Sequence, residues 1–465
     1  MSEAARCART VKAWGAALLV ALAACASPPA YGPAVGAQPG RPVHIESAQG
    51  TRLTAAQSAA VLEKLDRAGK ESDLLRRHIA IEEAVTGSPL VAGNKATLLE
   101  DGPATYKAMF AAIRAARDHV NLEVYIFRDD DVGKEFQQLL LAKQAQGVQV
   151  NLIYDSVGSI KTPRSFFDAM REKGVRVLEF NPVLPSAATG NVNHRDHRKL
   201  LVVDGRIAFV GGINIDDVYS SSSAASFRKS SEDEKKTGWR DLHVRIEGPV
   251  AAEFQKLFLE HWKKQDAEPL PQRRYFPEVK PAGDELVRAL GASADEQDAV
   301  VYQTLLYAVK YAQKTVHVTV AYFIPDEQTV AILGAAARRG VDVTLILPGQ
   351  TDFWAVFEAG RSHYTELLEA GVKIYEREGA LLHSKTAVVD GAWSSIGSTN
   401  WDPRSFVHND EINAEILGPD FAARMEQAFR KDLEKSKRIR LEEWRKRSLA
   451  LRLKQWTARM WEYWL

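Results

Sequence analysis

An internal repeat sets the narrowest limits on how this chain can fold. An apolar strand, an amphipathic helix and a second apolar strand follow one another between residues 121 and 154, and the same series returns between residues 316 and 347. Gly147 and Gly340 begin the second strand of each copy. Strands that alternate with helices are typical of βαβ crossovers, which build sheets covered by helices. The sequence therefore predicts an α/β fold with two similar halves, each a mixed sheet flanked by helices.

A short polar motif occurs once in each half. Each copy starts with His-x-Lys, reaches Asp-Gly after four mostly apolar residues, and leads through a second run to two small residues and an asparagine. One such pair is usually solvated or locally bonded, whereas two copies with the same spacing indicate a function. The triplet His261-Trp-Lys263 lacks the aspartate, and we interpret it as a surface feature. The two copies consist of His197, Lys199, Asp204, Gly211, Gly212 and Asn214, and of His383, Lys385, Asp390, Gly397, Ser398 and Asn400.

The Asp-Gly pair in each motif predicts a β-hairpin. If Asp204 and Gly205 form a two-residue turn, His197 lies opposite Gly212, and Lys199 lies on the same face of the sheet. The second motif repeats this pattern. A small residue opposite each imidazole would leave room for a ligand. Asp204 and its equivalent Asp390 would lie at the turns, where aspartate side chains bond to local backbone, so we assign both a structural role.

Two histidines, two lysines and two asparagines in equivalent positions suit the binding of one tetrahedral phosphate. The lysines and Asn214 and Asn400 would neutralise its charge, one imidazole would attack phosphorus, and the other would protonate the leaving oxygen. A metal site built from the histidines with Asp204 and Asp390 is the weaker alternative, because lysine is a poor ligand and both aspartates fall at turns. We therefore expect neither a metal nor an organic cofactor.

The doubled motif resembles the HKD signature of the phospholipase D superfamily. The segments from Gly238 to Pro249 and from Asn400 to Glu411 look most like those of bacterial cardiolipin synthases, and the resemblance covers residues from about 95 to about 430. It implies a pseudo-twofold pair of halves with one active site at their interface, and a covalent phosphohistidine. It also implies that Asp241 and Glu411 orient the imidazoles, with His197 as nucleophile and His383 as general acid.

The resemblance implies a transphosphatidylase. Such an enzyme transfers a phosphatidyl group from one phosphatidylglycerol to the glycerol hydroxyl of another and releases glycerol. Three alternatives stay open: a phospholipase D that hydrolyses phospholipids to phosphatidic acid, a nuclease, and a lipid-binding protein without activity. The chain has 61 basic and 60 acidic residues, and this balance argues against a general nucleic-acid partner. The sequence does not fix the oligomeric state.

The first segment of the chain is typical of a secretion signal. Basic residues precede an eleven-residue apolar run from Trp14 to Ala24, which is shorter than a membrane span. The sequence before Cys25 resembles a bacterial lipobox, which implies cleavage after residue 24 and lipidation of Cys25. We therefore expect a membrane-anchored lipoprotein in the bacterial envelope, facing the periplasm.

Composition divides the remainder of the chain. A segment rich in proline and glycine follows Cys25 and reads as a tether, and a second proline-rich stretch reads as a linker between the halves. The serine-rich stretch from Ser220 to Gly238 predicts a mobile loop. The expected divisions are a signal peptide at 1–24, a tether at 25–45, an N-terminal half at 46–264, a linker at 265–283, a C-terminal half at 284–430 and a tail at 431–465.

The tail has the pattern of an amphipathic helix. Residues 435–465 carry ten Lys or Arg and three Glu, and an apolar stripe with two tryptophans recurs at helical spacing. A basic helix of this kind suits an anionic lipid surface, so we expect a membrane contact there. The alternative is a helix packed on the catalytic domain. The stripe consists of Leu449, Leu453, Trp456, Met460 and Trp464.

Two histidines and two tyrosines outside the motifs are further candidates for the site. His194 and His363 are single residues, for which we expect supporting or structural roles. Tyr125 and Tyr322 occupy equivalent strands of the repeat. They could line the site, but core packing is the favoured prediction.

Overall fold

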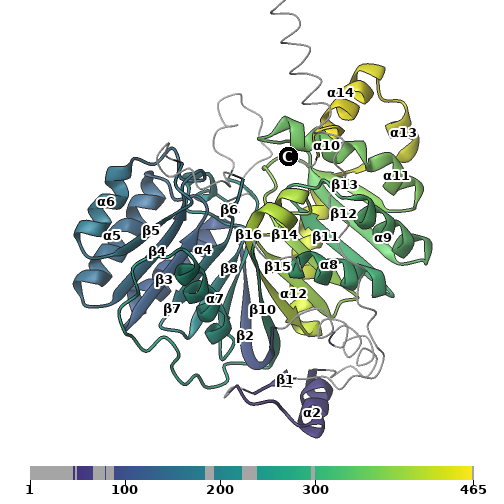
Figure 1. Cartoon of the computed structure of the whole chain (residues 1–465). Coiled ribbons are helices and arrows are strands. Elements are labelled where there is room, and N and C mark those ends of the chain that lie inside the picture. The colour runs from purple at the N-terminus through teal and green to yellow at the C-terminus, as the bar shows by residue number, and fades with distance from the viewer. Residues whose placement is uncertain are drawn as a thin grey trace, which may run out of the picture.

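The structure is a computed structural model of the chain (Figure 1). The expected signal peptide, the lipidated cysteine and most of the tether lie outside the described residues, as does most of the serine-rich loop. The structure describes residues 45–47, 50–65, 79, 88–183, 193–222, 238–294 and 299–462.

The N-terminal half is built on seven strands in the order β5-β4-β3-β7-β8-β9-β2. The strands β3, β4 and β5 run parallel, and the other neighbours run antiparallel. The bounds are β2 (Leu90–Glu100), β3 (His119–Val124), β4 (Gln149–Asp155), β5 (Arg176–Phe180), β7 (Lys199–Val203), β8 (Ile207–Gly211) and β9 (Leu242–Glu247).

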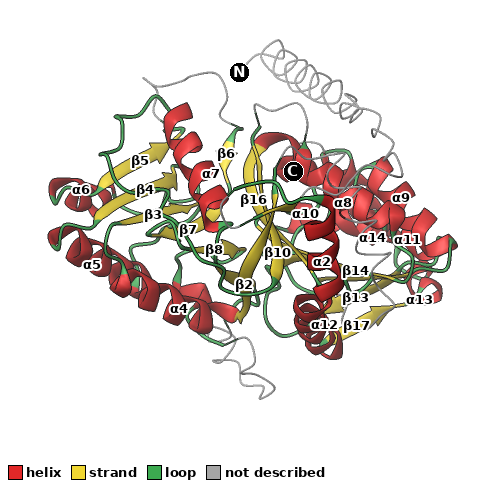
Figure 2. Ribbon diagram, turned by 90° about the horizontal axis from the view of Figure 1, so that it is seen from below, coloured by secondary structure: helices red, strands yellow, loops and turns green. Residues whose placement is uncertain are grey.

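Helices cover both faces of this sheet, as Figure 2 shows. Apolar side chains of α4, α5 and α6, such as Phe110 and Phe136, pack with Leu122 and Leu152 of the strands in one core. On the opposite face α7 packs against β7 and β8 in a second core. The bounds are α4 (Asp101–Ala115), α5 (Asp131–Ala145), α6 (Arg164–Glu172) and α7 (Ala251–Lys264).

The C-terminal half repeats the same strand order and adds one strand at its edge. Its order is β10-β16-β15-β14-β11-β12-β13-β17, in which β11, β12 and β13 run parallel like β3, β4 and β5. The bounds are β10 (Glu285–Ala292), β11 (Thr315–Val320), β12 (Asp342–Pro348), β13 (Lys373–Arg377), β14 (Lys385–Val389), β15 (Trp393–Gly397), β16 (Asn409–Leu417) and β17 (Ser436–Ile439).

The remaining elements flank these sheets. The helices α8 and α9 cover the C-terminal sheet, and α10, α11, α13 and α14 lie together at its outer end (Figure 1). The bounds are β1 (Ile45–Glu46), α2 (Ala55–Leu65), β6 (Arg195–Asp196), η1 (Asp217–Tyr219), α8 (Val300–Tyr311), α9 (Glu327–Arg338), α10 (Trp354–Ser362), α11 (Tyr364–Glu369), the π-helical segment η3 (Arg404–His408), α12 (Pro419–Glu434), α13 (Leu441–Arg445) and α14 (Leu449–Arg459).

The two halves join through their first strands. β2 pairs antiparallel with β10, so the two sheets are continuous and a pseudo-twofold axis passes between these strands. One core is shared: Phe254 and Phe258 of α7 belong to the same cluster as Phe421 and Met425 of α12. Residues 265–284 contain neither helix nor strand and connect α7 to β10. The α/β fold with two related halves is therefore confirmed.

The hairpins of the two motifs form, but their register differs from the prediction by one residue. Val203 pairs with Ile207 rather than with Arg206, so the turn contains three residues. Asp204 and Gly205 both adopt positive φ, at 52° and 61°. In the second motif Asp390 has a φ of 56°. Val389 pairs with Trp393, so this turn also contains three residues. A left-handed aspartate and a left-handed glycine start each turn, and the residue after the glycine completes a loop of three residues.

Candidate active site

The two histidine segments cross from one half of the molecule to the other. The short strand β6 of the N-terminal half pairs in parallel with the start of β16, and the His197 amide donates to the Asp410 carbonyl over 2.9 Å. On the other side of the pseudo-twofold axis, Arg240 forms a parallel bridge with Leu382, and the His383 amide donates to the Arg240 carbonyl over 2.7 Å. Each histidine therefore lies beside the residue that follows its backbone partner in the other half. That residue is Glu411 for His197 and Asp241 for His383.

That next residue is a carboxylate in both cases. His197 Nδ1 lies 3.0 Å from each oxygen of Glu411, and His383 Nδ1 lies 2.8 Å from Asp241 Oδ2. All four side chains are buried. Each half thus supplies one imidazole and holds the imidazole of its partner half, so neither dyad is complete without both halves.

The small residues of the motifs make room for these carboxylates. A Cβ at Gly212 would lie 2.4 Å from Asp241 Oδ1, and in the equivalent place the Ser398 hydroxyl donates to Glu411 over 2.5 Å. The prediction that these positions leave space for a ligand is wrong, because the carboxylates of Asp241 and Glu411 lie there. The predicted cross-strand partners of the two histidines are also wrong, because the hairpin register differs from the prediction by one residue.

The two lysines point toward the histidines from β7 and β14. Lys199 Nζ donates to the His197 carbonyl over 2.6 Å and lies 5.2 Å from the centre of the Tyr125 ring. Lys385 Nζ donates to the His383 carbonyl and lies 3.1 Å from His383 Nδ1. Both ammonium groups are therefore held at the dyads by backbone carbonyls.

The equivalent tyrosines face the histidines rather than the core. The ring centres of Tyr125 and His197 are 5.1 Å apart, and those of Tyr322 and His383 are 6.2 Å apart. Both tyrosines are only partly buried. The favoured prediction of core packing is wrong for Tyr125, whereas Tyr322 contacts an imidazole and also packs against a small apolar cluster that includes Ala458. A third tyrosine breaks the symmetry, because the buried Tyr219 hydroxyl lies 3.1 Å from His383 Nδ1.

The two asparagines of the motifs differ in their contacts. Asn214 Oδ1 accepts a hydrogen bond from the Ile126 amide over 3.1 Å. Asn400 is also buried, but its Oδ1 has no hydrogen-bond partner among the described residues. The two amides are equivalent in the sequence and are bonded differently in the structure.

Burial and charge set the protonation of the site. Burial lowers the pKa of both His197 and His383 well below the usual value, and the neighbouring lysines lower it further. Burial also lowers the pKa of Lys199 to about 7 and of Lys385 to about 8. These shifts keep both imidazoles neutral at neutral pH, before an anion is bound.

The pKa values of the two carboxylates that contact the imidazoles are shifted in the opposite direction. Burial raises the pKa of Asp241 to about 7 and of Glu411 to about 7, against the opposing effect of the lysines. The carboxylates and ammonium groups around the two imidazoles therefore titrate within a narrow range around neutral pH.

The motif aspartates lie at the far ends of the hairpins. Asp204 accepts hydrogen bonds from the amides of Arg117, Asp118 and His119 over 2.8 to 3.2 Å, and Asp390 accepts equivalent bonds from residues 313 to 315. Both carboxylates therefore bind backbone, as expected, but it belongs to the loop that enters β3 or β11 rather than to the turn itself. These hydrogen bonds use the carboxylate oxygens that a metal ion would need as ligands at Asp204 and Asp390.

The triplet at His261 is not a surface feature. His261 is buried on α7, with Nδ1 at 2.7 Å from Glu123 Oε1 and Nε2 at 3.1 Å from Asp410 Oδ2. The charge of Glu123 helps to raise the pKa of His261 to about 10 against the effect of burial. The spacing of Phe254, Phe258 and His261 on one helical face was the signal that could have predicted this burial.

The other single histidines have supporting contacts. His194 Nε2 lies 2.9 Å from Asp410 Oδ1, next to Glu411 in the chain. His363 is buried and its Nε2 lies 3.0 Å from Glu462 of the tail. The contacts described for these two histidines are with carboxylates and not with the imidazoles of His197 and His383, so their supporting or structural roles stay predictions.

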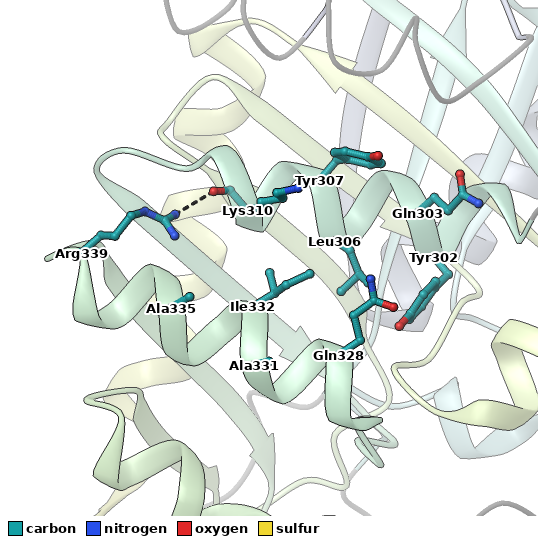
Figure 3. A pocket seen from close by; sticks show the side chains of 10 residues that line it. All are labelled: Tyr302, Gln303, Leu306, Tyr307, Lys310, Gln328, Ala331, Ile332, Ala335 and Arg339. Carbon is teal, nitrogen blue, oxygen red and sulfur yellow. Dashed lines mark hydrogen bonds between the residues drawn. The ribbon is translucent and has the colours of Figure 1, made fainter. Parts of the chain in front are cut away.

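A separate apolar pocket lies in the helical layer of the C-terminal half. It has a volume of about 470 Å³ and lies between α8 and α9, with Leu306 and Ile332 on its walls (Figure 3). Arg339 donates to the Lys310 carbonyl at one end of it, over 2.8 Å. None of the motif residues lines this pocket, so it is distinct from the histidine site.

The fold and the crossed dyads define a class of protein: the phospholipase D superfamily in its two-lobed form. The sequence profile of the family described as "Cardiolipin synthase, PLD-like domain" matches residues 109–226 and 305–433. The chain therefore belongs to this family.

Individual relatives and solved structures agree with this placement. Cardiolipin synthase of Geobacillus kaustophilus is 34% identical over 406 residues, which span 87% of this chain and 78% of the relative. Cardiolipin synthase 2 of Bacillus cereus is 35% identical over 365 residues, which span 78% and 69%. The crystal structure of phosphatidylserine synthase of Haemophilus influenzae superimposes with a TM-score of 0.62 at 14% identity, over 84% of this chain and all of that chain. This last likeness concerns the fold alone.

Proposed function

We propose that this protein is a cardiolipin synthase, which transfers a phosphatidyl group between phosphatidylglycerol molecules through a phosphohistidine. The observation that carries the proposal is the pair of crossed dyads, in which the imidazoles of His197 and His383 are each held by a carboxylate of the other half. The names of relatives that match most of the chain supply the choice of substrate.

The first step forms the covalent intermediate. Neutral His197 attacks phosphorus through Nε2, because its Nδ1 is engaged by Glu411. The bond between phosphorus and the glycerol oxygen breaks, and His383, protonated once the anionic phosphate is bound, gives its proton to that oxygen. Glycerol leaves, and the phosphatidyl group stays on His197. The ammonium groups of Lys199 and Lys385, with Asn214 and Asn400, neutralise the phosphate oxygens.

The second step consumes the intermediate. A glycerol hydroxyl of a second phosphatidylglycerol attacks phosphorus, and His383 takes its proton. The bond between phosphorus and nitrogen breaks, cardiolipin leaves, and both histidines return to their first states. If water attacks instead, the product is phosphatidic acid, which is the outcome expected of a hydrolase.

The proposal includes a membrane location. A signal peptide at residues 1–24, an acylated Cys25 and the basic C-terminal segment would hold the enzyme at a bilayer of the bacterial envelope, facing the periplasm, where its substrates reside. The structure contributes one finding here: none of the helices it describes is both long and apolar enough to cross a bilayer.

The test is product analysis with labelled phosphatidylglycerol vesicles. Wild type should form labelled cardiolipin, whereas His197→Ala and His383→Ala should form none. His317→Ala is the matched control, because His317 lies outside the site and bonds to Glu426 of α12. Phosphatidic acid as the sole product would identify a hydrolase, and cleavage of DNA without lipid turnover would identify a nuclease.

A chelator arm tests the metal-free mechanism. The residues at the reacting centre are imidazoles, ammonium groups and amides, which act on phosphate without an ion. Activity should therefore persist after extended treatment with chelator. A complete loss of activity that zinc restores would contradict the mechanism.

A further inference from the structure

An exposed apolar surface runs over the tail helix and the start of a neighbouring helix. Its side chains are 41% to 80% exposed, which is unusual for tryptophan and leucine gathered in one place. The sequence predicted four of these side chains in the tail, from Leu449 to Met460, but neither Trp461 nor the part at the start of α10. The predicted Trp464 lies outside the described residues. We call this surface the apolar ridge, and it consists of Phe353, Trp354, Leu449, Leu453, Trp456, Met460 and Trp461.

The ridge is fixed to the folded body of the protein. Figure 1 shows α14 beside α10, and the helices contact each other through the opposite face of α14, where Gln455 and Ala458 are buried. Lys454 bonds to Glu358 of α10 over 3.0 Å, and its ammonium lies 5.4 Å from the centre of the Trp354 ring. Packing on the body therefore uses one face of the helix and leaves the apolar stripe in solvent.

The ridge lies beside the active site. Ala458 of α14 belongs to a small apolar cluster against which Tyr322 packs, and the Tyr322 ring faces His383. The Tyr322 hydroxyl donates to Asp352 over 2.9 Å, and the next two residues are Phe353 and Trp354 of the ridge. A bilayer that covers Phe353 and Trp354 would therefore lie near Tyr322, whose ring faces His383.

The charge around the ridge indicates an anionic partner. Lys446, Arg452 and Lys454 are exposed on the same segment, and residues 435–462 carry ten Lys or Arg against three Glu. A second copy of the chain would bring two such basic segments together, which like charges oppose. Tryptophans flanked by basic residues are typical of helices that lie at the surface of an anionic bilayer.

We propose that the apolar ridge is a docking surface for a bilayer that contains anionic phospholipid, and that docking places the side of the candidate site that carries Tyr322 next to the lipid. This inference rests on the proposed function, because docking would let a phospholipid substrate reach the imidazoles without crossing water. It extends the membrane contact proposed for the C-terminal segment to a second segment, at the start of α10, and this contact is independent of Cys25.

The cysteine content of the chain makes a direct test possible. The two cysteines, Cys7 and Cys25, both precede the described residues, so Cys7→Ser with Cys25→Ser gives a full-length chain without cysteine or acyl anchor. Leu453→Cys in this background carries a polarity-sensitive fluorophore on the ridge. Ile160→Cys is the matched control, because the Ile160 side chain is 68% exposed, close to the 60% of Leu453, and lies in the N-terminal half.

The probe is vesicles of phosphatidylglycerol and phosphatidylcholine, compared with phosphatidylcholine alone. We expect the emission of the label at position 453 to shift to the blue with the anionic vesicles, and that of the label at position 160 to stay unchanged. Lys446→Gln with Arg452→Gln should weaken the vesicle titration of the label at position 453 about tenfold or more. Unchanged emission of the label at position 453 in the presence of anionic vesicles would overturn the proposal. An emission shift that depends on protein concentration in the absence of vesicles would overturn it in favour of a dimer.

Turnover of a short-chain phosphatidylglycerol below its micelle concentration separates this proposal from the proposed function. The variant Leu453→Ser with Trp456→Ser should keep wild-type turnover of the dispersed substrate and lose most of its turnover on vesicles. Equal turnover of wild type and variant on vesicles would contradict docking while leaving the enzyme assignment intact. A blue shift without turnover of either substrate would contradict the enzyme assignment and leave docking intact.

Discussion

Each imidazole of the site depends on a carboxylate that lies far away in the sequence. Glu411 holds His197 Nδ1, so Nε2 is left to face the substrate. Glu411→Gln should therefore lower kcat/KM about 10³-fold to 10⁴-fold, as amide replacement does in other histidine dyads, because the wrong tautomer is favoured. The measurement is steady-state turnover together with thermal unfolding.

The matched control is Glu426→Gln. Glu426 also bonds to a histidine, His317, but lies outside the site. It should keep kcat/KM within about threefold of wild type. Wild-type activity in Glu411→Gln would show that the carboxylate has no part in orienting the ring.

The pH dependence of kcat/KM follows from the shifted groups. Lysine must be charged to bind phosphate, and the lowered pKa values of about 7 for Lys199 and about 8 for Lys385 predict a loss of activity as pH rises through that range. The carboxylates must be ionised, and their pKa values, raised to about 7, predict a loss as pH falls through 7. The profile should be a narrow bell centred near neutral pH.

One substitution separates the two limbs of this bell. Lys199→Arg keeps its charge at high pH, so its alkaline limb should move up toward pH 8, where Lys385 titrates, while the acid limb stays in place. The check is a kcat/KM profile of both proteins on dispersed phosphatidylglycerol. A profile of wild type that stays flat from about pH 6 to about pH 9 would contradict the assignment.

At the residue scale the sequence predicted the members of the site but not its pairing. The repeated spacing identified His197 and His383, and the resemblance supplied Asp241 and Glu411. Which carboxylate holds which histidine depends on how the two halves dock, and no local pattern encodes that. The space at Gly212 was misread for the same reason, because the group that fills it arrives from another strand.

Among the elements, the motif hairpins show how a turn residue fixes distant backbone. The Asp204 carboxylate satisfies the amides of three residues that enter β3, and its own φ of 52° is costly for most side chains. Asp204→Ala leaves those amides without a partner, and should lower the free energy of unfolding by about 2 to 4 kcal/mol in a urea titration.

The control for this prediction is an exposed carboxylate. Glu135 forms a surface ion pair with Arg114, and both side chains are more than half exposed. Glu135→Ala should cost less than about 1 kcal/mol. A similarly small loss in Asp204→Ala would mean that the anchor contributes little to the fold.

The hairpin also marks the limit of sequence reasoning about elements. Asp-Gly predicted the turn and both strands, yet a positive φ at Asp204 and Asp390 suits a two-residue loop as well as a three-residue loop. Contacts of the two aspartates with residues 117 to 119 and 313 to 315 fix the position of each loop. Those contacts come from the tertiary fold, so the pattern alone could not give the register.

Across the whole molecule, a buried cluster of charges fastens the two halves together. Asp432 of α12 accepts from Arg240 of the N-terminal half over 2.9 Å and from Arg377 of β13 over 3.0 Å. Arg240 also lies next to the orienting Asp241. Asp432→Ala would leave two buried guanidinium groups without this partner and should lower the free energy of unfolding by about 3 to 5 kcal/mol.

Urea unfolding followed by tryptophan fluorescence measures this loss. Glu369→Ala is the control, because Glu369 pairs with Arg445 at the surface, where both side chains are about half exposed. It should change stability by less than about 1 kcal/mol. A loss of the same small size in Asp432→Ala would show that the halves do not rely on this cluster.

The sequence predicted the architecture at this scale, because repeated strands and helices must bury equivalent faces. It did not predict that β2 and β10 join the two sheets, or that α7 and α12 share one core. Treating residues 265–283 as a linker suggested more independence than the halves have. The pairing of first strands brings the histidine ends of both hairpins to one place.

The central claim is that His197 and His383 act in different roles on one phosphorus atom. A phosphatidyl ester of nitrophenol tests it, because this leaving group departs without a proton. In His383→Ala the first step should proceed and the second should stall, which gives a burst of nitrophenolate of about one equivalent per chain. His197→Ala should give no burst. A burst from His197→Ala, or steady turnover at about half the wild-type rate in both variants, would contradict the account.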